Sequence, residues 1–483
     1  MSRINTNVPA IRAIRQLDRN FSDLTLRLER LSTGLRINRG RDDPAGLIAS
    51  ERLRYEIGGL RQAIDNSIRA NNVISTAEAA LGEVNSLLLD LQALVVEAAN
   101  KGALTSEEVN ANQLQIDSIL ASIDRIANTT SFGSKKLLDG SQAYNLSSVP
   151  TAALASVTIF AARLTQGVSR QVKVTVTQSA QTGQIAFVGG TAGGISTTSA
   201  STIELQGPIG TEILSFASGT TFADIKAAIN SVTAATGISA IVSSPSIGTI
   251  ASTVLMNTTT FGSDAFLSVT PIQGSFIATG NTNTVIRDDG RDATVLVDGQ
   301  PAFVRGLRAD VRTAGLDTQI YLTEKFGQTL SSATFEITGG GTLFQLTSEV
   351  TPNGQVHMGL NSVRTTQLGN PVIGLLYSLR SGSQNDLSSQ NFLTAQNIIR
   401  EAIDEVATYR GRLGNLQRNT IDTNMNSQGV ALENVIASES LIRDANMAEE
   451  LSALTRAQVL VQSTQAALQI ANAVPNLVLS LLG

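Results

Sequence analysis

The chain has 483 residues, enough for roughly three domains of ordinary size. Its 35 Lys and Arg residues nearly balance 40 Asp and Glu residues, and the formal net charge of -5 argues against a nucleic-acid binder, which usually carries a basic excess. With one His and no Cys or Trp, the chain lacks the usual ligands of zinc and iron–sulfur sites and any thiol nucleophile. We therefore expect no catalytic residue, no metal site and no cofactor, and a protein that is not an enzyme.

Charge is distributed unevenly along the chain. Residues 1–141 carry 34 charged side chains, whereas residues 142–286 carry only eight and are rich in Ser, Thr, Gly and Ala. No run of about 18 apolar residues predicts a membrane span, and residues 1–9 lack the apolar segment of a secretory signal peptide. We expect no membrane insertion, and, if the chain is exported, a route that does not use that signal.

The first predicted element is a helix over residues 4–35. Its apolar residues recur at steps of three or four, the spacing of a face that packs against another helix. The helix ends near Gly34, and Asp43 with Pro44 predicts the start of the next one, because Asp caps free N–H groups and Pro needs no N–H at the first helical position. The stripe consists of Ile4, Val8, Ile11, Ile14, Leu17, Phe21, Leu24, Leu28, Leu31 and Leu35.

Further helical patterns follow before residue 133. An apolar stripe from Ile74 to Val95 predicts a helix that stops near Gly102. Thr105 and Glu108 have the spacing of a capping box, which predicts the start of another helix.

Between residues 142 and 375 the apolar pattern alternates, which predicts β-strands. Asp298 and Gly299 separate two such runs and predict a two-residue hairpin. Thr221 caps one predicted helix, over residues 222–229. The predicted strands cover residues 171–177, 238–242, 293–297, 301–304, 318–322, 334–337, 343–346 and 356–360.

Candidate site residues in this centre have simpler interpretations. The glycine clusters at 189–194 and 339–341 lack the Lys-Ser/Thr of a phosphate-binding loop, so we interpret them as turns. A catalytic triad would have to use His357, which we interpret instead as a partly exposed strand residue.

The C-terminal region is helical again. Apolar residues at steps of three and four predict a helix over residues 392–416, followed by a weak point at residues 426–429. We expect the N- and C-terminal helices to pair and the remaining apolar faces to be buried by self-association, with an ordinary bundle inside one chain as the alternative. The predicted polymerisation interface consists of Ile4, Val8, Ile11, Leu17, Phe21, Leu24, Leu28, Leu31, Leu35, Met447, Leu454, Val461, Leu468, Val478 and Leu482.

Motifs at both ends resemble those of the bacterial flagellins. Residues 30–47 resemble the hallmark near the N-terminus of that family, and residues 132–140, 410–419 and 478–482 look like further family motifs. The resemblance covers residues 1–141 and about 385–483, roughly half of the chain. The hallmark positions in this chain are Arg36, Ile37, Asn38, Asp42, Asp43, Pro44 and Gly46.

This resemblance implies an α+β multidomain fold. Long terminal α-helices would form a discontinuous coiled-coil bundle, with β-rich central domains inserted between them. The implied parts are an inner-tube coiled coil (1–42 with 448–483), an outer-tube helical domain (43–141 with 375–447), a variable β-rich domain (142–286) with a flagellin repeat-like segment at 201–245, and a second β-rich outer domain (287–374).

The implied function is that of a structural subunit of the bacterial flagellar filament. The chain would be exported unfolded through the flagellar type III channel and polymerise head-to-tail into a hollow helical tube, the propeller for swimming. A hook–filament junction (hook-associated) protein is the alternative. The implied partners are further copies of the chain, the flagellar export apparatus, an export chaperone, and the filament cap and hook-associated proteins. The implied location is secreted and extracellular.

Two departures from the family pattern carry expectations. Asp90 stands where flagellins recognised by the vertebrate innate flagellin receptor usually have arginine, which reverses the charge. We expect weak or absent receptor activation, with a merely solvated helix residue as the alternative. Some relatives carry a zinc-protease motif with two histidines, which a chain with one His lacks. An adhesive role of the central domains stays open.

Overall fold

The computed structural model describes residues 6–100, 102, 104–164, 168–188, 200–243, 253–274, 286–313 and 315–482, with the backbone alone from residue 474 on. Helices at both ends and antiparallel sheets in the centre confirm the predicted α+β class. The glycine cluster at 189–194 lies outside the described residues. The chain divides into two compact units: Met1–Ala70, Gln345–Gln355 and Arg418–Gly483 form the first, and Asn71–Phe344 and Val356–Gln417 form the second.

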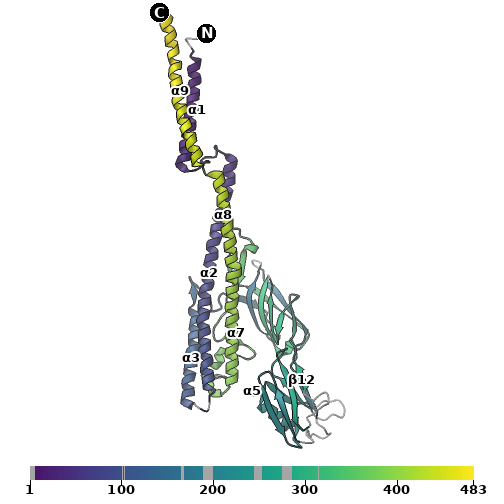
Figure 1. Cartoon of the computed structure of the whole chain (residues 1–483). Coiled ribbons are helices and arrows are strands. Elements are labelled where there is room, and N and C mark those ends of the chain that lie inside the picture. The colour runs from purple at the N-terminus through teal and green to yellow at the C-terminus, as the bar shows by residue number, and fades with distance from the viewer. Residues whose placement is uncertain are drawn as a thin grey trace. The chain divides into compact units, whose positions relative to one another are not determined.

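The first unit is helical. α1 (Val8–Thr33) and α9 (Met447–Leu482) run side by side, and the first residues of α1 lie at the same end of the pair as the last residues of α9 (Figure 1). The N-terminal part of α2 (Pro44–Ala98), α8 (Thr423–Arg443) and the segment Gln345–Gln355 also belong to it. The predicted boundary after α1 is confirmed, because Gly34 ends the helix in the left-handed conformation with φ at 72°.

One prediction about the C-terminal helices is wrong. The expected weak point at residues 426–429 lies inside the regular helix α8, and the departure from α-helical geometry is instead a π-helical segment at Gln417–Asp422. The reason is a tertiary contact: Gln428 is buried and its side-chain amide donates to the carbonyl of Leu346, which holds this stretch helical despite the neighbouring Gly429.

The helical part of the second unit buries apolar stripes as predicted. The rest of α2, α3 (Ser106–Thr129) and α7 (Phe392–Leu416) contribute them. The capping box is confirmed, with Glu108 accepting from the Thr105 backbone N–H at 2.7 Å. Arg410 on α7 pairs with Glu78 on α2 at 2.7 Å. The fully buried side chains include Ile74, Leu81, Leu88, Leu91, Ile116, Leu120, Ile123, Ile399 and Val406.

Among the described helices, α2 alone contains a stretch apolar enough and long enough to cross a membrane. Core helices of soluble proteins meet the same criterion by length and composition. In this structure Leu81, Leu88 and Leu91 of α2 are fully buried against protein.

The β-rich centre of the second unit has two apolar cores. The first β core lies between two sheets, with strand orders β14-β13-β5-β18-β3 and β15-β16-β17-β4. The predicted hairpin is confirmed, since Val297 pairs with Gln300 across Asp298 and Gly299, which both have positive φ. The elements are β3 (Tyr144–Ser147), β4 (Leu154–Ala162), β5 (Arg170–Gln178), β13 (Thr294–Val297), β14 (Gln300–Pro301), β15 (Phe303–Arg305), β16 (Arg308–Arg312), β17 (Leu316–Leu322), α6 (Glu324–Gly327) and β18 (Ser332–Gly340).

The second β core lies between sheets of order β6-β10-β9 and β12-β11-β7-β8, with α4 packed on it. The predicted helix start is confirmed, because the Thr221 hydroxyl accepts from the Asp224 N–H. The elements are β6 (Gln184–Val188), β7 (Ser201–Gln206), β8 (Thr211–Phe216), α4 (Phe222–Ser231), α5 (Thr233–Thr236), β9 (Ile238–Ser243), β10 (Thr253–Thr258), β11 (Phe266–Gln273) and β12 (Ile286–Asp289).

The second β core is inserted into the first. β5 and β13 are neighbours in one sheet, and the chain leaves after β5 and returns before β13. At this neck Gln181 and Arg291 exchange two backbone hydrogen bonds of 2.8 and 2.9 Å. The segment expected at 142–286 begins with β3, β4 and β5. These strands therefore share sheets with strands of the segment expected at 287–374.

Short elements link the centre to the helices. They are β1 (Ser131–Phe132), β2 (Lys135–Lys136), β19 (Thr342–Gln345), β20 (Gln355–Met358), β21 (Gly369–Asn370) and β22 (Gly374–Leu375). The glycine cluster expected to be a turn lies partly in a strand: Gly339 and Gly340 are the last residues of β18 and pair with Asn145 and Tyr144 of β3, next to a register shift. Only Gly341 follows the strand, and all three glycines have positive φ. His357 is a half-buried residue of β20, and burial, with Arg163 nearby, lowers its pKa.

Candidate assembly surface

α1 and α9 pair in antiparallel fashion through a narrow seam. Leu17, Leu24 and Leu31 on α1 are half-buried, and Val461 on α9 is buried. Small side chains fill much of the rest, including the buried Ala10 and Ala457. Leu454 and Leu468 are also half-buried on α9. The seam therefore buries part of the predicted interface within one chain.

Polar contacts cross the same seam. Asn20 is 7% exposed, and its side-chain amide donates to the Leu460 carbonyl at 3.3 Å and to the Thr464 hydroxyl at 3.2 Å. The buried Glu450 carboxylate accepts from Arg27 at 2.9 Å and from Arg30 at 3.0 Å. Burial alone would raise the pKa of Glu450, but the bonds from both guanidinium groups outweigh it and lower that pKa.

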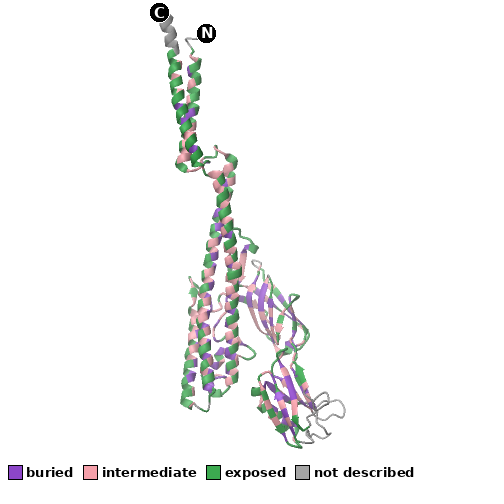
Figure 2. Cartoon of the chain, viewed as in Figure 1, coloured by how far each residue is buried: buried purple, intermediate pink, exposed green. Residues whose placement is uncertain are grey.

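A second series of apolar residues stays on the surface of α1. Ile14, Phe21 and Leu28 follow each other at intervals of seven, and Phe21 and Leu28 are 45% and 50% exposed. Val8, Ile11 and, on α9, Met447 are likewise exposed. The predicted stripe thus consists of two interleaved series, one in the seam and one on the flank. Figure 2 shows both helices mainly exposed or intermediate, with few buried residues.

Sequence reasoning missed the flank of α9. Its exposed apolar residues fall outside the seven-residue repeat that starts at Met447, so that repeat does not predict them. The apolar residues on the other faces of the same helix are the signal that could have indicated them. They are Leu451, Val459, Leu460 and Ile470. We call these residues, together with Val8, Ile11, Ile14, Phe21, Leu28 and Met447, the apolar flank. Ile4 lies outside the described residues, as do the side chains of Val478 and Leu482.

The hallmark residues form the connection between α1 and α2. Leu35, half-buried, forms an isolated β-bridge with Asp444, between α8 and α9. The Arg36 backbone N–H donates to the Arg443 carbonyl at 2.7 Å, and its guanidinium donates to the Ile442 carbonyl at 2.6 Å. The structure therefore joins this connection to the turn between α8 and α9.

Acidic residues shape the turn itself. Asp42 accepts from the N–H of Arg39 at 2.8 Å and of Asn38 at 3.1 Å, and these bonds lower its pKa. Asp43 caps α2 by accepting from the Gly46 N–H at 2.8 Å, and Pro44 is the first residue of the helix.

Glycine is required at residue 46. Ile37 is buried against the start of α2, and a Cβ on Gly46 would lie 2.4 Å from the Asp43 carboxylate and 2.8 Å from Ile37. The hallmark residues therefore form a tightly packed turn. Each of those described above has a structural role in it.

α2 and α8 carry further exposed apolar residues within the first unit. The helices are joined by a hydrogen bond from Ser50 to Glu439 at 2.9 Å. Tyr55 of α2 is 81% exposed and Leu441 of α8 is 84% exposed. Large apolar side chains that are this exposed are typical of a surface that a partner covers.

Asp90 lies on the exposed face of α2 within the second unit. Its neighbour Leu89 is exposed as well, as is Val96 two turns further on. The altered position is thus accessible in a single chain, and the receptor expectation stays a prediction.

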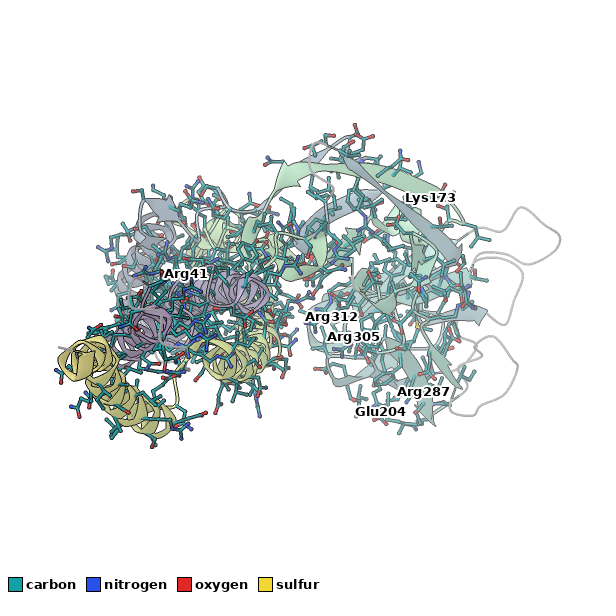
Figure 3. The ribbon with its side chains drawn as sticks, turned by 90° about the horizontal axis from the view of Figure 1, so that it is seen from above. Arg41, Lys173, Glu204, Arg287, Arg305 and Arg312 are labelled. Atoms are coloured by element: carbon teal, nitrogen blue, oxygen red, sulfur yellow. The ribbon has the colours of Figure 1, made fainter. Side chains whose placement is uncertain are left out.

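The β-rich part presents paired charges. Figure 3 labels Lys173, Glu204, Arg287, Arg305 and Arg312 on its strands, and Arg41 on the connection between α1 and α2. Arg287 pairs with Asp289, Arg305 with Asp264 and Arg312 with Asp317. These arginines form local ion pairs rather than a cationic patch for an anionic ligand.

One cavity of about 500 Å³ lies in the second unit between strands of the first β core, the segment 361–375 and α7. Glu405 of α7 faces it and accepts from the Gly369 N–H at 3.0 Å. Burial, and to a lesser degree Glu401, raises the pKa of Glu405 to about 7. Burial also raises the pKa of Tyr321, which lines the cavity, to about 12.

These groups do not make a catalytic constellation. His357 does not line the cavity, and the described hydrogen bond of Glu405 comes from a backbone N–H rather than from a hydroxyl nucleophile. Within the described ranges no group of His, Asp and Glu residues is placed to hold a metal ion.

Comparison with known proteins agrees with the motifs at both ends. The bacterial flagellin N-terminal helical region matches residues 4–143, and the C-terminal helical region matches residues 396–482. A flagellin from Clostridium tyrobutyricum is 28% identical over 481 residues, covering 97% of this chain and 98% of its own length. A flagellin from Bacillus subtilis is 42% identical over 139 residues, which cover 29% of this chain and 46% of that protein.

Two further matches cover most of the chain. The B-type flagellin of Pseudomonas aeruginosa is 27% identical over 538 residues, covering 99% of both chains. The solved structure of flagellar hook associated protein-3 from Legionella pneumophila is 12% identical, with a TM-score of 0.32, covering 80% of this chain and 97% of that one. Because the flagellin regions match at both ends and the flagellins of two organisms align over almost the full length, the chain belongs to the bacterial flagellins and is a structural subunit of the flagellar filament.

Proposed function

We propose that the apolar flank of the α1–α9 pair binds further copies of this chain, so that subunits join head-to-tail into a hollow helical tube that serves as the swimming propeller. The observation that carries this proposal is the heptad series Ile14, Phe21 and Leu28, which stays exposed although the neighbouring series is used in the seam. Apolar side chains repeated along a helix are stable in water only when another surface covers them. A contact between different surfaces of identical subunits that does not close produces a helical polymer.

The character of the seam supports the same proposal. Two helices held by alanines, a few leucines and buried polar groups bury little apolar area, so the pair gains stability when subunits pack around it. Assembly and ordering of the chain ends are then coupled. In this proposal residues 1–42 and 448–483 form the inner tube, and residues 43–141 and 375–447 form the outer tube. The β-rich domains, at 142–286 and 287–374, face solvent.

We also propose that the chain is exported unfolded through the flagellar type III apparatus, assisted by an export chaperone, and reaches the cell exterior. It would then assemble beneath a filament cap and above hook-associated proteins. The absence of cysteine fits passage through a narrow channel, because no disulfide has to form or break on the way.

A flank variant tests assembly directly. Phe21→Ser combined with Leu28→Ser removes exposed apolar area while leaving the seam intact, so we expect a soluble subunit that no longer forms sedimentable filaments. Arg19→Ser, at an exposed position of the same helix, is the matched control and should polymerise as the unaltered chain does. Deletion of residues 448–483 should also leave a soluble subunit that does not polymerise. Normal filaments from either the double variant or the truncation would refute the proposed role of the flank.

A further inference from the structure

We propose that polar anchors in the seam, rather than its apolar residues, fix the register in which α1 and α9 pair. The anchors are Asn20 and the ionic cluster of Glu450 with Arg27 and Arg30. This inference rests on the proposed function, because the register decides which residues of α9 stand beside Phe21 and Leu28 in the apolar flank.

The apolar part of the seam does not select one register. Its larger side chains repeat every seven residues on both helices: Leu17, Leu24 and Leu31 on α1, and Leu454, Val461 and Leu468 on α9. A slip of seven residues, about 10 Å along the axis, therefore places leucine or valine against leucine again. The small residues between them fit against any neighbour.

Asn20 loses its side-chain acceptor in a slipped pair. In the observed register its buried amide donates to the Thr464 hydroxyl and to the backbone carbonyl of Leu460. A slip of seven residues in either direction puts Ala457 or Ala471 in the place of Thr464. Neither alanine offers a side-chain acceptor, so a buried amide would lose a hydrogen bond.

The charge of Glu450 also favours the observed register over the slipped ones. In the observed register it lies between Arg27 and Arg30, and its side chain is 8% exposed. One slip would place this carboxylate opposite Asn20 and Asp23, and the other would move it past the end of α1 at Gly34. In both cases a buried carboxylate loses both of its cations, which a helix pair of this size does not tolerate.

A competing determinant lies at one end of the pair. The Ala445 N–H donates to the Gly34 carbonyl at 2.9 Å, next to the bond between Arg36 and Arg443. These backbone bonds also belong to one register only. They lie outside the helical seam, so variants of the anchors leave them in place and separate the two explanations.

Disulfide mapping reads the register directly, because the chain contains no cysteine of its own. Asn7→Cys with Ala471→Cys reports the observed register, since the Asn7 side chain contacts the Ala471 carbonyl at 2.8 Å. Ile14→Cys with Ala471→Cys reports a slip of seven residues, because Ile14 follows Asn7 by one heptad. Asn7→Cys with Thr464→Cys reports the opposite slip. The full-length monomer is oxidised gently and the cross-linked peptides are quantified by mass spectrometry.

With the anchors intact, we expect the first pair to cross-link and both shifted pairs to fail. With Asn20→Leu and Glu450→Leu together, we expect the first pair to lose most of its yield and a shifted pair to gain at least as much. Glu449→Leu, a neighbouring exposed acid, is the control and should leave the yields unchanged. In a chain that keeps Asn20, the combined substitutions Arg27→Glu, Arg30→Glu and Glu450→Arg reverse the ion pairs. We expect the first cysteine pair to cross-link in this chain with the yield seen when the anchors are intact.

Two results overturn the proposal. Unchanged yields in the anchor variant mean that the backbone bonds near Gly34 suffice to set the register. A loss at every reporter with no gain at a shifted one means that the anchors stabilise the pair without selecting its register. Filament formation is measured separately by sedimentation, so that a flank variant that still polymerises counts against the proposed function and leaves the register result standing.

Discussion

Glu405 makes the stability of the second unit depend on pH in a direction that the structure fixes. This carboxyl lies at the cavity beside α7, and its pKa rises from an ordinary 4.5 to about 7, chiefly because of burial. An acid with a raised pKa in the folded state holds its proton more tightly there than in the unfolded chain. Its contribution is therefore fully favourable below pH 4.5 and is lost as the pH rises towards about 7.

The size of the effect follows from the same two values. The difference between 4.5 and about 7 corresponds to about 3 kcal/mol of unfolding free energy at pH 8. Because part of the side chain faces the cavity, where water solvates its charge, we expect Glu405→Gln to gain about 1–3 kcal/mol at pH 8. Glutamine retains the acceptor for the Gly369 N–H, so the variant should match the unaltered chain at pH 4.5 within about 1 kcal/mol.

Urea unfolding of the full chain at pH 4.5 and at pH 8, followed by circular dichroism, measures this difference. Asp404→Asn is the matched control, since Asp404 is the preceding residue of α7 and its side chain is exposed. The control should give the same change in stability at both pH values. If Glu405→Gln also gives equal changes at both, or is more destabilising at pH 8, the assignment of a buried, protonated carboxyl to this cavity is refuted.

Two further predictions concern the helical part of the second unit. Leu91→Ala should lower the unfolding free energy by about 2–5 kcal/mol in urea titrations, because the side chain is fully buried, whereas the half-exposed Leu89→Ala should cost less than about 1 kcal/mol. Asp124→Ala should cost about 1–3 kcal/mol and increase hydrogen exchange at Thr365, since the Asp124 carboxylate accepts from the Thr365 N–H at 2.8 Å and pairs with Arg380. Equal costs at the two leucines, or unchanged exchange at Thr365, would contradict these assignments.

Local signals in the sequence predicted most of the helical architecture. The capping box at Thr105, the end of α1 at Gly34 and the start of α2 at Pro44 depend on residues within one turn of each other, so the sequence alone suffices. The same holds for the hairpin at Asp298 and Gly299. Such signals fail where a distant contact decides, as at Gln428, whose bond to Leu346 keeps α8 regular.

The candidate assembly surface was predictable only in part. A repeat of apolar residues shows that a helix has a face to bury, but it does not say which partner buries it. On α1 the leucines at 17, 24 and 31 and the residues at 14, 21 and 28 look alike in sequence, and only the position of α9 separates seam from flank. Similarly, the pairing of β5 with β13 brings together strands more than a hundred residues apart, which no local pattern encodes.

The neck between Gln181 and Arg291 gives the second β core the properties of an exchangeable module. The chain enters and leaves this core through adjacent, mutually hydrogen-bonded residues, so the loop closure required of the surrounding fold does not depend on what lies between them. The second β core can thus be lengthened, replaced or deleted while the terminal helices keep their sequence. In the proposed filament, where the β-rich domains face solvent, the exterior can therefore change in sequence and size without any change in the residues proposed to hold the subunits together.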